Sequence, residues 1–179
     1  AAAFGTMAVC LFYLLAQMAG AGGLVSLLLN INDRAGQALV IVIVGVLAAV
    51  AIPQYNKYIA RTQVAEAFAV LSSVKQALTL YYQENGEFPQ HGHFNNRADA
   101  VGILKRNQWN SATNYIWRLF IIDRNGKVRV IFKGHSQGVN KLIASRRFEL
   151  WPVLNGSVIT SWECRPTGNA SQRIDEAYI

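Results

Sequence analysis

Charge is almost absent from the first 56 residues of this chain, and this absence limits the folds that the chain can adopt. No charged residue occurs from Ala1 to Asn32 or from Ala35 to Asn56, and only Asp33 and Arg34 separate the two runs. Because a helix needs about 20 apolar residues to cross a bilayer core, each run is long enough to span a membrane once. A helical hairpin buried in a large soluble protein would also be apolar on every side. The sequence offers no large soluble domain to cover such a hairpin, so we predict a membrane protein.

The charged residues gather in the rest of the chain, from residue 57 onward. This part holds 16 of the 17 basic and 9 of the 10 acidic residues, so it carries the whole net charge of +7. Its roughly 120 residues are enough for one modest hydrophobic core. The first 30 residues do not fit a secretory signal peptide, because they lack a basic start and their apolar stretch is too long. We therefore expect two apolar helices followed by one small head.

The first apolar segment, residues 4–29, is rich in small residues near its middle. Gly20 and Gly23 are predicted either to pack closely on another helix or to mark a bend or break. A polar link over residues 30–37, with the sequence NINDRAGQ, is short enough to join antiparallel helices. If both apolar segments span the membrane, the amino terminus and the head lie on the same side. Arg34 favours a cytoplasmic position for the link.

The second apolar segment, residues 38–52, runs directly into an amphipathic helix pattern. Gly45, Ala48 and Ala49 are the positions at which we expect it to pack on other membrane helices. We predict a kink rather than an end at Pro53, because helical periodicity resumes directly after it. The apolar positions of the continuation share one face, and they are Val64, Phe68, Leu71, Leu78 and Tyr82. The two parts predict one rod of about 45 residues and about 65 Å, half in lipid and half under a sheet.

After the breaker ENGEFP at residues 84–89, the pattern changes from helical to extended. An irregular stretch with a short helix around residues 98–105 is expected first. Two hairpin turn sequences follow, DRNG at residues 123–126 and Asn155-Gly156. The first lies between the strand-like stretches YIWRLFII and KVRVIF, and the second lies between RFELWPVL and SVITSWEC. Trp151 before Pro152 fits the edge or the end of a strand. We predict three or four antiparallel strands after one long helix.

Several stretches resemble the type IV pilin family in order and spacing. The long helix contains GVLAAVAIPQY and NKYIARTQVAEAF and ends at YYQENGEFP. The carboxyl-terminal half contains GKVRVIF, ELWPVLNGSVITSWEC and IDEAYI, which are similar to the closing strands of bacterial major pilins. The resemblance covers about residues 38–179 and leaves residues 1–37 without a counterpart.

The resemblance implies a structural protein of the α+β class, with a long amino-terminal helix packed on a small antiparallel sheet. The uncharged run at the start of the chain adds a transmembrane segment before that helix. Residues 1–36 would form the extra segment and its turn, residues 37–83 the pilin-type helix with 38–52 in the membrane, and residues 84–179 the head. Such a subunit lies in the bacterial inner membrane with a periplasmic head, and at the cell surface when assembled in a filament. Its expected partners are membrane lipid and other pilin or membrane-complex subunits, which its apolar helices contact. No cofactor, metal, small-molecule substrate or enzymatic activity is expected.

The chain departs from the family at the positions that lead to assembly. Pilins are cut after a glycine, begin with a methylated aromatic residue and carry a glutamate close behind it. Counting back from Gly45 and Pro53, the corresponding positions hold Ile31, Asn32 and Gly36. The alternative is therefore an accessory subunit that stays in the membrane and docks to a larger membrane complex without forming a filament.

The two cysteines lie far apart in the sequence. Cys10 falls in the first apolar segment, where we expect a small buried hydrophobic residue. Cys164 resembles the first cysteine of the pilin disulfide, because Trp162 precedes it by two residues. Its partner is not in the chain, so either the represented chain stops before that partner or Cys164 is a free thiol.

Three further patterns suggest other chemistry. His91 and His93 supply only two of the three or four ligands that zinc needs. The letters GHSQG fit a serine nucleophile elbow, but the strand-to-helix context of that elbow is missing, so catalysis is not expected. Basic residues of the sheet region would attract DNA phosphates, although a solvated sheet face explains them more simply. The candidate anion or DNA contacts are Arg118, Lys127, Arg129 and Lys133.

Overall fold

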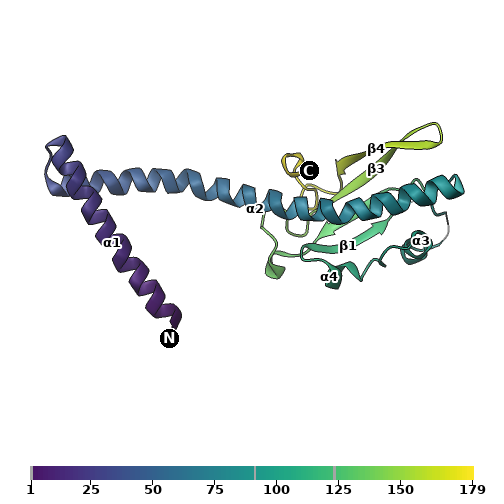
Figure 1. Cartoon of the computed structure of the whole chain (residues 1–179), viewed down its shortest axis with the longest axis horizontal. Coiled ribbons are helices and arrows are strands. Elements are labelled where there is room, and N and C mark those ends of the chain that lie inside the picture. The colour runs from purple at the N-terminus through teal and green to yellow at the C-terminus, as the bar shows by residue number, and fades with distance from the viewer. Residues whose placement is uncertain (1, 91, 123) are drawn as a thin grey trace. The chain divides into compact units, whose positions relative to one another are not determined.

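A computed structural model describes residues 2–90, 92–122 and 124–179 (Figure 1). Its helices are α1 (Ala2–Leu29), α2 (Asp33–Asn85), α3 (Phe94–Val101) and α4 (Trp109–Ala112), and its strands are β1 (Ile116–Ile121), β2 (Val128–Phe132), β3 (Arg147–Asn155) and β4 (Val158–Pro166). Short 3₁₀ helices are η1 (His135–Gln137) and η2 (Glu176–Tyr178). The chain forms two compact units, Ala1–Tyr55 and Asn56–Ile179. We call the first the hairpin and the second the head, and describe each by itself.

The link between α1 and α2 is shorter than the predicted residues 30–37. It is shorter because α2 already begins at Asp33. The Oδ1 atom of Asn32 accepts a 2.8 Å hydrogen bond from the backbone N–H of Ala35, which satisfies one of the free donors at a helix start. At the other end of the link, Asn30 adopts a left-handed φ of 53°, as residues that end helices often do.

Both long helices are continuous. α1 runs through Gly20 and Gly23, so the helix break considered for this stretch is wrong. α2 has 53 residues and contains Pro53 in its interior. It is longer than the predicted rod mainly because it starts earlier. A proline removes one hydrogen bond from a helix, and the kink at Pro53 stays a prediction.

The head contains a four-stranded antiparallel sheet with the order β1-β2-β3-β4 (Figure 1). Its long helix and antiparallel sheet confirm the predicted α+β fold. The register joins Val130 to Leu119 on one side and to Phe148 on the other. β3 and β4 pair from Phe148 to Asn155, so they extend as a two-stranded ribbon past the last β2 partner, Leu150.

Trp151 and Pro152 lie inside β3 and not at its end, but they lie where β3 is an edge strand, the other position predicted for them. Proline lacks the N–H that a central strand must donate to its neighbours. β2 pairs with β3 only as far as Leu150, so Pro152 has β4 as its strand partner and needs no donor toward β2. The fold therefore accommodates this proline where the sheet has narrowed to two strands.

The hydrophobic core lies between α2 and the sheet. Helix residues at intervals of three and four turn one face to the sheet, and these are Ala60, Val64, Ala67, Leu71, Val74 and Leu78. The sheet supplies Val128, Val130, Phe132, Phe148 and Leu150. Phe68 and Tyr82, which were predicted on this face, are only partly buried and pack at the rim of the core. Each fully buried valine, leucine or phenylalanine side chain of the core contributes about 1.5–3 kcal/mol to the free energy of unfolding, so this layer stabilises the head.

The segment between α2 and β1 differs from the prediction of a helix over residues 98–105. α3 ends at Val101 because Gly102 takes a left-handed φ of 75° and bonds back to the last turn. The Phe94 ring of α3 packs on Phe120 of β1, with 4.6 Å between ring centroids. This segment thus covers the side of the sheet opposite the core at β1.

Candidate interaction surfaces

α1 and α2 contact one another where two glycines meet. A Cβ on Gly22 would lie 2.5 Å from Cγ of Gln37, and a Cβ on Gly36 would lie 2.5 Å from the carbonyl oxygen of Gly22. Only glycine allows this approach, as in other close helix contacts in membranes. The Ser26 hydroxyl, 3% exposed, donates a 2.7 Å hydrogen bond to Oδ1 of Asp33. Sequence reasoning missed this contact because α1 is apolar on all sides.

Gly20 and Gly23, the positions predicted for close packing, do not make this contact. A Cβ on either residue would meet no atom within 4 Å. Both therefore remain predicted contact positions for helices of other molecules. The same is true of Gly45, whose added Cβ would also meet nothing, and of the exposed Ala48 and Ala49.

The apolar part of α2 is uncovered within its own unit. Every residue from Ile41 to Tyr55 is exposed, including Val46 at 60% and Ile52 at 62%. Among the described residues, two helices, α1 and α2, are long and apolar enough to cross a membrane by length and composition. An apolar surface of this size indicates contact with lipid or with other helices.

The face of the sheet opposite the core carries a buried ion pair. Glu149 in β3 has a side chain only 8% exposed, and its Oε1 accepts a 2.6 Å bond from Arg129 of β2, its partner in the register. Its other oxygen, Oε2, accepts a 3.1 Å bond from Nε1 of Trp151. Lys127 and Arg165 lie 3.7 Å and 4.3 Å from the Trp151 ring, within the range of cation–π attraction.

The four predicted anion contacts lie in or directly beside β1 and β2, but protein groups already engage them. Arg129 is paired with Glu149, and Lys127 lies over Trp151. Lys133 donates a 2.7 Å hydrogen bond to the backbone oxygen of Thr113. Arg118 lies 3.7 Å from the ring of its neighbour Trp117.

Cys164 lies in β4 opposite Leu150 and packs against the core. Burial raises the pKa of its thiol to about 11, although the Lys75 charge opposes this shift. Both Cys164 and the exposed Cys10 are free thiols among the described residues. The predicted disulfide of Cys164 therefore stays a prediction.

A polar clamp at one end of the head was also missed. Gln63 on α2 is only 7% exposed, and its Nε2 donates to the carbonyl of Gly138 at 3.1 Å. Its Oε1 accepts from the backbone N–H of Asn140 at 2.8 Å, and the Asn140 side chain donates to the carbonyl of Asn56 at 3.1 Å. The polar Gln63 beside the apolar helix face was the only sign of this clamp in the sequence.

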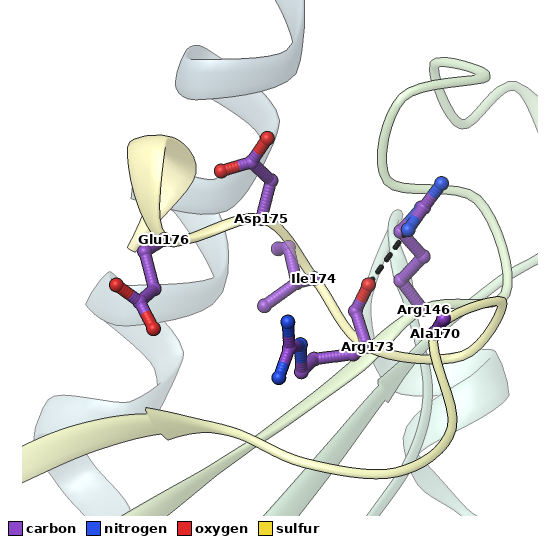
Figure 2. Close-up of a pocket in the computed structure, with 6 residues that line it drawn as sticks. All are labelled: Arg146, Ala170, Arg173, Ile174, Asp175 and Glu176. Carbon is purple, nitrogen blue, oxygen red and sulfur yellow. Dashed lines mark hydrogen bonds between the residues drawn. The ribbon is translucent and has the colours of Figure 1, made fainter.

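The carboxyl-terminal segment borders an open cavity of about 410 Å³. Figure 2 shows its lining side chains spread around the space rather than converging on one point. Arg146 donates a 2.7 Å hydrogen bond to the backbone oxygen of Arg173 (Figure 2). Asp175 and Glu176 line the same cavity. Among these residues no pair of groups has the geometry of a nucleophile and its base.

The two other chemical patterns also lack a completed site in the described residues. Ser136 of GHSQG lies in η1, not at a turn from a strand into a long helix. The ring nitrogen Nδ1 of His135 lies 2.8 Å from the carbonyl oxygen of Val139. His91 lies outside the described residues, and these residues contain no group of three potential metal ligands.

The helix-on-sheet head matches a known family. The family model described as pilin, a bacterial filament protein, matches residues 60–179. This chain belongs to the pilin family. Members of this family are structural proteins, and the features of the chain are those of a type IV pilin-like protein.

Individual relatives of the pilin family agree with this assignment. The chain is 37% identical over 127 residues to the type IV major pilin protein PilE1 of Neisseria gonorrhoeae, which covers 70% of this chain and 63% of that pilin. It is 34% identical over 140 residues to a fimbrial protein of Neisseria meningitidis serogroup A, over 78% of this chain and 72% of that protein. The chain thus spans about two thirds of the length of these relatives.

A short stretch resembles a different protein. Over 46 residues, 26% of this chain, the sequence is 65% identical to 8% of a monocarboxylic acid transporter of Corynebacterium glutamicum. The pilin family model begins only at residue 60. The hairpin therefore lies outside the part of the chain that matches the family model.

Proposed function

We propose that this protein is an inner-membrane-anchored pilin subunit with a periplasmic head, which assembles into a pilus or a related secretion or adhesion filament. The observation that carries the proposal is the continuous α2. Its first part exposes apolar side chains from Ile41 to Tyr55, and its second part buries an apolar face under the sheet. Membership of the pilin family supports the same role.

The exposed part of α2 suits both the membrane and a filament. Lipid and a bundle of identical apolar helices offer similar surroundings, so transfer between them changes apolar burial little. Gly45, Ala48 and Ala49 are the positions at which we propose that copies approach closely. Repeated contacts between copies then build a helical filament without closing into a ring. In this proposal residues 1–36 are an extra segment, residues 37–83 the pilin helix and residues 84–179 the head.

DNA is not among the partners that we propose. Glu149 neutralises Arg129, and Lys133 already donates to a backbone oxygen, so two of the four candidate cations are engaged by the head itself. The partners that we propose are membrane lipid and other pilin or membrane-complex subunits.

A second candidate function is an accessory subunit that remains in the membrane. The contact between Gly22 and Gly36 favours it, because it joins an additional apolar helix to the start of α2. We propose that the stretch similar to the transporter lies within this hairpin, whose apolar composition is that of a membrane protein. Two spans would have to leave the bilayer together before such a subunit could enter a filament.

Fractionation of cells that express the chain distinguishes the two functions. An antibody against the head is applied to fibres sheared from the cell surface and viewed by electron microscopy, and to the detergent extract of the membranes. The filament function predicts labelled fibres. Labelling only in the detergent extract would reject the filament and favour the accessory role. A chain found in the soluble fraction, and neither in fibres nor in membranes, would reject both.

A further inference from the structure

One end of the head is built where α2 meets the loop between β2 and β3. The clamp of Gln63 and Asn140 holds this loop against α2 at Asn56, with three hydrogen bonds of 2.8–3.1 Å. Asn56 is the last residue of the uncharged run that begins at Ala35. The clamped loop therefore lies beside the part of the head that directly follows the apolar stretch in the chain.

Three cations and one tyrosine are exposed at this end. Lys57 and Arg61 are one helical turn apart on α2, and Lys141 follows the clamp residue Asn140 in the loop. Tyr58 is 63% exposed on the same stretch of helix. No salt bridge within the described parts of the chain involves any of the three cations. We call Lys57, Tyr58, Arg61 and Lys141 the basal collar.

The two acidic residues that bracket the collar in the sequence form hydrogen bonds with other partners. Glu66, the first acidic residue on α2 after the collar, accepts a 2.9 Å hydrogen bond from the side chain of Asn114. Asp33 is the acidic residue that precedes the collar, and it belongs to the hairpin turn. The collar therefore presents positive charge and an aromatic ring to its surroundings.

We propose that the basal collar binds the headgroups of anionic phospholipids. The proposal rests on the membrane anchoring proposed above. Lys57 is the first charged residue after the apolar run. Each basic residue at such a position strengthens binding to an anionic lipid surface by about fivefold. Tyrosine is enriched at the membrane–water interface for its amphipathic ring, and long basic side chains reach the headgroups from nearby backbone positions. The clamp keeps Lys141 at the same end as Lys57.

The experiment uses the full chain in lipid nanodiscs and measures amide hydrogen exchange over residues 134–146. One set of discs contains phosphatidylcholine alone, and the other contains about 30% phosphatidylglycerol in addition. Exchange of this loop should be at least about fivefold slower in the anionic discs. The difference should disappear in about 1 M salt, where the Debye length is about 3 Å.

Two variants with equal charge loss separate the collar from the general positive charge of the head. The collar variant combines Lys57→Gln, Arg61→Gln and Lys141→Gln. The control variant combines Lys105→Gln, Arg124→Gln and Arg165→Gln, which are exposed elsewhere on the head. The collar variant should lose the slow exchange in anionic discs, and the control variant should keep it. Equal loss in both variants would overturn the proposal.

Two further outcomes would also overturn it. Equal exchange in both disc types at low salt would reject the collar while leaving membrane anchoring intact. Inorganic phosphate that slows exchange as much in phosphatidylcholine discs would show an anion site with no preference for lipid. A chain that enters neither disc type would reject the anchoring itself and the collar with it, so the two failures are distinguishable.

Discussion

The same kind of apolar residue is exposed in the hairpin and buried in the head. Val46 and Val64 lie on the same helix, yet Val46 is 60% exposed and Val64 is 2% exposed. The sheet covers the helix at Val64, whereas nothing in its own unit covers it at Val46. The head is therefore stabilised by its own core, and the hairpin needs an apolar environment supplied from outside.

The match to the family model falls within one of these two units. The pilin family model matches only from residue 60, which lies in the head. The unit that the family model matches is thus the unit that buries its own core.

The largest expected effect comes from truncating the core of the head. Phe148→Ala removes a ring that is fully buried beside Phe68 and Phe132, and it should destabilise the head by about 3–5 kcal/mol. All four tryptophans lie in the head, so denaturant unfolding followed by tryptophan fluorescence in detergent reports on this unit alone. The matched truncation Val46→Ala in the hairpin should leave that transition unchanged. If Val46→Ala shifts it equally, the head does not unfold independently of the hairpin.

A smaller effect should follow from removing the buried carboxylate of the sheet. Glu149→Ala leaves the Arg129 guanidinium and the Trp151 N–H without their acceptor, which should cost about 1–3 kcal/mol. Glu163→Ala, which breaks the exposed pair with Arg165, should change stability by less than about 1 kcal/mol. The same fluorescence assay measures both. Equal effects of the two substitutions would mean that burial of Glu149 does not matter.

In the hairpin, the close contact of two glycines gives the corresponding test. Gly36→Ala places a methyl group 2.5 Å from the backbone oxygen of Gly22 and should weaken the contact by about 1–3 kcal/mol. Amide hydrogen exchange of residues 32–37 in detergent should therefore become faster. Gly45→Ala is the control, because its methyl group meets no atom within 4 Å. Slow exchange in Gly36→Ala would contradict the helix contact.

The pH dependence of the Cys164 thiol gives a further test in the head. Its folded pKa of about 11 lies above the ordinary value of 9.0, so the protonated thiol is favoured in the folded head. This contribution is present below pH 9 and is lost as the pH rises through about 11. Alkylation of Cys164 in the folded head should be slow at pH 8 and accelerate toward pH 11, whereas denatured protein should react readily at pH 8. Fast alkylation of the folded protein at pH 8 would show that the thiol is not buried as described.

The sequence predicts the long elements well because their patterns are long. The helix face from Val64 to Leu78 repeats over several turns, and Asn155-Gly156 marks the turn between two strands. The same signals fail in short elements: α3 was placed across Gly102, although this glycine ends the helix. A terminal glycine and an internal one look alike until the backbone angle is known.

Contacts between segments far apart in sequence were not predictable. Gly22 rather than Gly20 or Gly23 contacts α2. α1 is apolar on all sides here, so no distinct face in its sequence marks the point at which the two helices meet. Pro152 in the middle of β3 depends on where β2 ends. Gln63 is a buried polar residue whose partners, Gly138 and Asn140, come from a distant loop.

The carboxyl-terminal segment closes the head late in synthesis. Ile174 is completely buried in the same core as Ala60, and a parallel bridge between Arg147 and Arg173 fixes it there. A translating ribosome delivers the core face of α2 long before Ile174, so that face is made without this contact. Because contacts between such distant residues form slowly, we expect α2 to expose part of its apolar face in the nascent head until Ile174 is added.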